Sequence, residues 1–79
     1  MTVRFFAQAR ELGGCDTWEF CPPSPLTPAE LWDRLEEEFP AIGRIRDSAR
    51  FARNFEYATG DTLFQDSDEV AVIPPVSGG

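Results

Sequence analysis

The last residues of the sequence offer a carboxylate for chemistry, where most functional motifs offer a side chain. The sequence ends Pro74-Pro75-Val76-Ser77-Gly78-Gly79. Two glycines have no Cβ, so this end is thin enough to enter a narrow pocket, and two prolines stiffen the chain before it. We therefore expect residues 74–79 to form a flexible C-terminal tail that reaches into another protein. The two prolines at its start should make it project from the domain.

A carboxylate at Gly79 is a poor electrophile until it is activated. A partner that uses ATP can convert it to an acyl-adenylate, and a sulfur nucleophile that displaces AMP then leaves a thiocarboxylate. A protein that presents such a group needs no nucleophile or general base of its own. We therefore expect no stably bound cofactor in this chain, with ATP used by the activating partner.

The side chains that usually perform catalysis or bind metal are scarce. The sequence has no His, and its two cysteines, Cys15 and Cys21, lie six positions apart. This spacing matches neither a zinc site nor a Cys-x-x-Cys motif. We expect two reduced thiols and no metal site, as is usual in a cytosolic protein.

The charge balance narrows the class of partner. Asp and Glu number 14 against 7 basic residues, all of them Arg, which gives a net charge of −7. Nucleic-acid backbones and anionic membranes attract basic surfaces, so neither is an expected partner. A protein with a basic docking face fits better, because complementary charge speeds encounter. No apolar run is long enough to span a membrane, and strand-like residues from Thr2 onward indicate no signal peptide, so we expect a cytoplasmic location.

The first half of the sequence predicts two strands and a main helix. Residues 2–7 predict a strand with Val3, Phe5 and Ala7 on one face and Arg4 and Phe6 on the other. A short helical turn over residues 8–12 should end at two glycines, and a second strand should cover residues 17–20. The helix should begin at Thr27, because Thr27 and Glu30 form a capping-box pattern, and should end before Pro40. Its apolar stripe consists of Leu31, Trp32, Leu35 and Phe39.

The second half predicts further strands separated by turns. Residues 42–47 fit a loose turn or a short helix, and residues 50–58 a strand interrupted near Asn54. Turns are expected at residues 60–61 and 66–68. The last strand should cover residues 69–73, with Val70 and Val72 on one face and Ala71 and Ile73 on the other.

This order of elements predicts a single domain over residues 1–79 with an α+β, β-grasp fold: a mixed sheet of four to five strands and one main helix. In that fold the first and last strands are neighbours at the centre of the sheet. Phe6 and Ile73 would then lie close together, facing away from the core, and would form a candidate docking patch. The alternative is that they are two scattered surface residues, which are common on folded proteins.

Three stretches of the sequence resemble the small subunits of molybdopterin synthase, a family of sulfur carriers. Val3 to Leu12 (VRFFAQAREL) is similar to the family's first strand and following turn, and Asn54 to Tyr57 to its Asn-containing turn. Asp68 to Gly79 (DEVAVIPPVSGG) follows the family's terminal motif and is the most specific of the three. The likeness spans the whole chain and is weakest in the helix.

The resemblance implies a ubiquitin-like fold and a carrier that is not an enzyme by itself. In the family an ATP-dependent adenylyltransferase activates the terminal glycine, which corresponds to Gly79, and the product becomes a thiocarboxylate. The large synthase subunit, usually in a heterotetramer, then receives the tail, and sulfur passes to a pterin precursor of the molybdenum cofactor. Phe6, Tyr57 and Ile73 fall on positions that contact partners, with Pro74 and Pro75 beside them.

Two positions depart from the family pattern. Ser67 stands where a turn glycine is common, and Arg53 where an apolar strand residue is common. Arg53 should either lean out over the surface or pair with a nearby acid. Neither residue belongs to the tail.

Three other functions remain open from the sequence. The chain could be a related Gly-Gly sulfur carrier, for thiamine synthesis or tRNA thiolation. It could be a ubiquitin-like modifier joined through Gly79 to target lysines, although it has no lysine on which to build chains of itself. It could also be an interaction domain with an inert tail.

Overall fold

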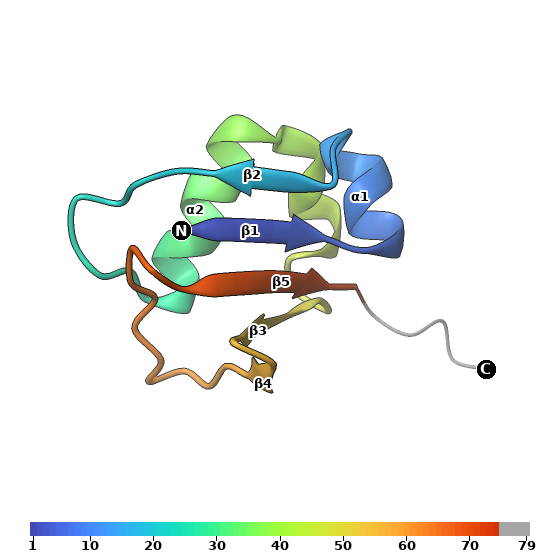
Figure 1. The fold of residues 1–79 in the computed structure, drawn as a ribbon. Helices are drawn as coiled ribbons and strands as arrows, with labels where there is room; N and C mark the ends of the chain where they lie inside the picture. Colours follow the sequence, from blue (N-terminus) through green and yellow to red (C-terminus); the bar gives the residue numbers. More distant parts are fainter. Residues whose placement is uncertain (75–79) are drawn as a thin grey trace.

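The structure is a computed structural model that describes residues 1–74 of the chain. Five strands form one mixed sheet in the order β2-β1-β5-β3-β4, and the helices pack on one of its faces (Figure 1). The elements are β1 (Thr2–Phe5), α1 (Ala7–Gly13), β2 (Thr17–Glu19), α2 (Pro28–Glu38), the 3₁₀ helix η1 (Pro40–Ile45), β3 (Arg50–Arg53), β4 (Glu56–Tyr57) and β5 (Glu69–Ile73). None of the helices within residues 1–74 is long and apolar enough to cross a membrane.

The centre of the sheet is the parallel pair of β1 and β5, as the β-grasp prediction requires. Val3 lies opposite Val70 and Phe5 opposite Val72, and all four side chains are buried. β2 and β3 add to the outer sides of this pair in antiparallel orientation. The predicted alternation of β5 is confirmed, because Val70 and Val72 enter the core while Ala71 and Ile73 face the other side.

Helix α2 begins and ends where its capping residues predict. The Thr27 N–H donates to Glu30 Oε1 (2.9 Å), and the Glu30 N–H donates to Thr27 Oγ1 (3.2 Å). This reciprocal pair gives each of the two backbone N–H groups a side-chain acceptor at the first turn. Leu31 and Leu35 are fully buried, so the apolar stripe of the helix packs toward the sheet and contributes to the core.

The first strand is shorter than the alternation predicted. β1 ends at Phe5, and Ala7 begins α1 with a positive φ of 48°. Hydrogen bonds from the N–H groups of Ala9 and Arg10 to the Phe6 carbonyl draw the chain into the helix. Ala7 is exposed and Ala9 is completely buried, so Ala7 does not continue the buried face of Val3 and Phe5.

Residues 50–58 form two strands and not one interrupted strand. β3 and β4 are antiparallel, with Arg53 opposite Glu56, and Asn54 and Phe55 make the two-residue turn between them. Both turn residues have positive φ, 50° and 74°. Positive φ at both central positions is the feature of a type I′ turn, whose twist matches that of the strands it joins.

Candidate functional site

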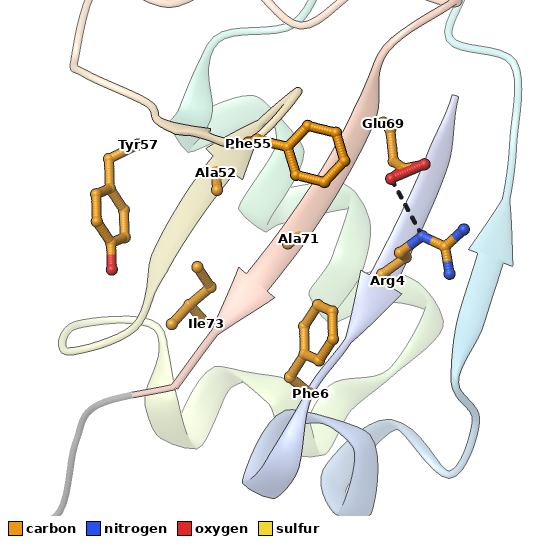
Figure 2. Close-up of a pocket in the computed structure, with 8 residues that line it drawn as sticks. All are labelled: Arg4, Phe6, Ala52, Phe55, Tyr57, Glu69, Ala71 and Ile73. Carbon is orange, nitrogen blue, oxygen red and sulfur yellow. Dashed lines mark ion pairs between the residues drawn. The ribbon is translucent and has the colours of Figure 1, made fainter.

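An apolar hollow of about 640 Å³ lies on the face of the sheet turned away from α2 (Figure 2). Its position follows from the strands, since residues that alternate with the buried ones must face this side. The residues that line it are Arg4, Phe6, Ala52, Phe55, Tyr57, Glu69, Ala71 and Ile73.

The floor of the hollow consists of two alanines. Ala52 on β3 and Ala71 on β5 are directly opposite each other in the antiparallel register. Large side chains surround them, and Figure 2 shows the rings of Phe6, Phe55 and Tyr57 around this small-residue centre. The depth therefore comes from the contrast between methyl groups in the middle and aromatic rings at the edge.

Phe6 and Ile73 form the wall nearest the exit of β5. Phe5 is paired with Val72. The next residues along the two segments are Phe6, directly after β1, and Ile73, the last residue of β5. The backbone of Phe6 stays extended (φ −117°, ψ 148°), which turns its ring to the side opposite Phe5. Phe6 is 50% exposed and Ile73 is half-buried. The predicted closeness of the two side chains on this face is confirmed.

Tyr57 forms the opposite wall from the edge strand β4. It pairs with Ala52 across the β3–β4 hairpin, and its ring is 63% exposed. The Arg50 guanidinium lies 5.7 Å from the centre of this ring. A cation at this distance is attracted to the face of the ring and restricts its orientation.

Phe55 stands at the rim and is hardly covered by its own chain, since it is 95% exposed. The turn that carries it is firmly held through Asn54. The Asn54 N–H donates to the Glu69 carbonyl (2.9 Å), the Glu69 N–H donates to Asn54 Oδ1 (3.1 Å), and Asn54 Nδ2 donates to Asp68 Oδ1 (3.3 Å). A positive φ at a residue with a Cβ costs about 1–2 kcal/mol, and these three hydrogen bonds hold the turn in that conformation.

The charges at the hollow balance each other. Arg4 Nε lies 3.3 Å from Glu69 Oε1 at one edge, and both side chains are roughly half exposed. Such a surface pair contributes little to stability, but it leaves the hollow without an excess of either sign. Arg53, which departs from the family pattern, donates to the Leu63 carbonyl (2.9 Å) and lies 4.0 Å from Asp68, so it pairs with a nearby acid away from the hollow.

The structure brings together three of the residues that the sequence singled out: Phe6, Tyr57 and Ile73. Pro74 follows directly after β5 and is half-buried, but it does not line the hollow. Pro75, Val76, Ser77, Gly78 and Gly79 lie outside the described residues, so their roles stay predictions. Cys15 and Cys21 are both free.

Sequence reasoning missed five of the lining residues: Arg4, Ala52, Phe55, Glu69 and Ala71. The alternation of β5 already placed Ala71 on the face of Ile73, so that signal was available. Phe55 gave no such signal, because nothing in the strand pattern of residues 50–58 indicates an aromatic residue with positive φ.

Comparisons with known proteins agree with this fold and with the resemblance of the sequence. The model of the ThiS family matches residues 3–79. The molybdopterin synthase sulfur carrier subunit of Arabidopsis thaliana is 40% identical over 77 residues, which cover 98% of this chain and 80% of that protein.

Two solved structures have the same fold. The small archaeal modifier protein 1 (SAMP1) of Haloferax volcanii matches with a TM-score of 0.84 and 30% identity, over 100% of this chain and 98% of that chain. The second is a solved protein–protein complex of subunits 1 and 2 of the molybdopterin-converting factor from Helicobacter pylori. One of its chains matches with a TM-score of 0.68 and 25% identity, over 99% of this chain and 96% of that chain. With its ubiquitin-like β-grasp fold, the chain therefore belongs to the ThiS family and is a relative of the molybdopterin synthase sulfur carrier subunits.

Proposed function

We propose that this chain is the sulfur carrier subunit of a molybdopterin synthase, with the carboxylate of Gly79 as its reactive group. The observation that supports this most strongly is the 40% identity to a molybdopterin synthase sulfur carrier subunit over 98% of the chain. The position of the hollow agrees with it, because Ile73 lines the hollow and the residues toward Gly79 follow directly. A protein that takes up the end of the chain would therefore lie against apolar surface.

The carboxylate of Gly79 is converted to a thiocarboxylate in two steps on an activating partner. A Gly79 carboxylate oxygen attacks the α-phosphorus of ATP, and pyrophosphate leaves to give the acyl-adenylate. Sulfide then attacks the acyl carbon, AMP leaves with the C–O bond electrons, and a thiocarboxylate remains. This chain contributes the carboxylate and the docking surface, and the ATP-dependent adenylyltransferase contributes the catalytic groups.

The large subunit of the synthase is the proposed site of sulfur transfer. A solved complex of subunits 1 and 2 of the molybdopterin-converting factor from Helicobacter pylori contains a relative of this chain, which supports a partner of that kind. The thiocarboxylate sulfur would bond there to a pterin precursor, and water would cleave the acyl–sulfur bond, which leaves sulfur on the precursor and a carboxylate on the carrier. By itself the chain is then a donor and not a catalyst.

The test is a reconstitution of molybdopterin synthesis from this chain, an activating enzyme, the large subunit, ATP and sulfide. The unchanged chain should support conversion of the precursor. A chain without Gly79, and a chain extended by one Ala after Gly79, should support none, while both keep the unfolding midpoint of the unchanged chain. Conversion by either altered chain would refute the proposal.

A protein modifier is the second candidate, favoured by the 30% identity to the small archaeal modifier protein 1. In that function the activated Gly79 would form an isopeptide bond with a lysine of a target protein. The chain has no lysine, so it would be attached singly. Mass spectrometry of proteins purified from cells through an N-terminal tag distinguishes the two functions, because only a modifier is recovered joined through Gly79 to lysines of many proteins.

A further inference from the structure

We propose that Phe55 is an anchor residue for the partner, and that its ring enters an apolar pocket on the large synthase subunit when the tail is held there. This inference rests on the proposed function, because that function names the partner. It extends the expected contact surface of Phe6, Tyr57 and Ile73 to a residue on the β3–β4 turn.

Phe55 adopts a costly backbone conformation without gaining burial in its own domain. Its φ of 74° is a value that glycine adopts freely and other residues adopt at a cost. Its ring is 95% exposed, so packing inside the domain does not offset that cost. A phenyl ring held in a strained position, without burial, gains its contacts elsewhere.

Hydrogen bonds of the neighbouring residue hold the turn that carries Phe55. Asn54 is tied to Asp68 and Glu69 by three hydrogen bonds, with lengths of 2.9, 3.1 and 3.3 Å. Asn is among the residues that tolerate positive φ, and its side chain fixes the turn to the start of β5. The backbone that carries the ring is therefore held in place before binding, which reduces the entropy lost when the ring binds.

The place of the ring indicates that its partner is the protein that receives the end of the chain. Phe55 lines the same hollow as Ile73, the last residue of β5 (Figure 2). The residues from Pro74 to Gly79 can span at most about 20 Å. A protein that encloses Gly79 therefore lies within reach of this hollow, and a single aromatic ring adds about 150–250 Å² of buried surface to its contact.

The charged residues at the hollow indicate that the contact is apolar. Arg4 and Glu69 neutralise each other at the edge of the hollow, with 3.3 Å between their charged atoms. The contact made by Phe55 should therefore be apolar and insensitive to salt, although the chain as a whole carries a net charge of −7. Long-range steering of the partner by that net charge and anchoring by Phe55 are then separable in experiment.

The test compares Phe55→Gly with the unchanged chain in binding to the purified large subunit of the synthase from the same genome, by surface plasmon resonance at low and high salt. Glycine relieves the positive φ, so the urea unfolding midpoint of Phe55→Gly should equal or exceed that of the unchanged chain. Its Kd should rise about 30-fold, as for a hot-spot residue. The loss should appear in the dissociation rate and be the same at both salt concentrations.

Two further variants keep the result interpretable. Leu63→Ala is the matched control, because Leu63 is also an exposed apolar residue (48%) but does not line the hollow, and its affinity should be unchanged. Phe55→Asn is a second test variant, because Asn tolerates positive φ and lacks the ring. It should bind as weakly as Phe55→Gly.

Three results would overturn the inference. The first is a Kd for Phe55→Gly within threefold of the unchanged chain, which leaves the proposed function intact. The second is loss of folding in both Phe55 variants, which assigns the ring to the fold. The third is a dimer of the unchanged chain that Phe55→Gly dissolves in analytical ultracentrifugation, which makes this face a contact between two copies. Absence of any binding by the unchanged chain would refute both this inference and the proposed partner.

Discussion

Phe6 and Ile73 lie side by side on the open face of the sheet because their neighbours Phe5 and Val72 are paired in the parallel register of β1 and β5. A shift of β5 by one residue in that register would turn Ile73 into the core and expose Val72. The burial of Val3 opposite Val70 prevents such a shift. The core of the domain thus fixes the geometry of its candidate docking surface.

Phe6→Glu and Ile73→Glu should each weaken binding to the large synthase subunit at least about 10-fold and leave the fold intact. Both side chains face the hollow and not the core, and a buried unpaired carboxylate in the complex is costly. Binding is measured by calorimetry and folding by circular dichroism. Loss of the native spectrum in either variant would show that its side chain supports the fold of the free chain.

Thr27→Ala should lower the free energy of unfolding by about 1 kcal/mol, the usual cost of losing an N-cap side chain. The reason is that the Glu30 N–H loses its acceptor, Thr27 Oγ1, at the first turn of α2. Thr27→Ser keeps the hydroxyl and is the control. Equal urea midpoints for all three chains would mean that the capping box does not stabilise α2 in solution.

Leu35→Ala should lower the free energy of unfolding by about 2–5 kcal/mol, since Leu35 is fully buried and the substitution leaves a cavity. Glu38→Ala, on the exposed side of the same helix, should change it by less than about 0.5 kcal/mol. Urea titration followed by tryptophan fluorescence measures both. A small effect of Leu35→Ala would contradict the packing of α2 on the sheet.

Substitutions at Asn54 should separate backbone strain from side-chain hydrogen bonds. Asn54→Gly removes both side-chain bonds, to Asp68 and Glu69, but tolerates the φ of 50°. Asn54→Ala removes the same bonds and adds the cost of positive φ, so it should be less stable than Asn54→Gly by about 1 kcal/mol. An equal stability of the two variants would show that the turn relaxes to negative φ.

The sequence predicted most of what depends on local patterns. Thr27 and Glu30 predicted the start of α2, and the alternation over residues 69–73 predicted β5 with the same bounds. The alternation over residues 2–7 failed at Ala7, because a helix begins there and alternation of side chains does not indicate where a strand ends. Burial of Ala9 in the core cluster depends on how α1 packs, which is a tertiary effect.

The candidate site was predicted in its aromatic and aliphatic walls but not in its shape. Phe6, Tyr57 and Ile73 were identified, whereas the hollow exists because Ala52 and Ala71 are paired across β3 and β5. That pairing joins residues far apart in the sequence and depends on strand register. Strand register cannot be derived from a single sequence. Phe55 was missed because its side chain is placed by a two-residue turn with positive φ, where glycine is the usual residue.

The most direct test of the central claim is the intact mass of the chain after incubation with ATP, the activating enzyme and sulfide. Replacement of one carboxylate oxygen of Gly79 by sulfur should raise the mass by about 16 Da, and the fragment ions should place that gain on Gly79. The chain without Gly79 should show no gain. An unchanged mass for the full chain with an activating enzyme that is proven active, or a gain located on Cys15 or Cys21, would contradict the account.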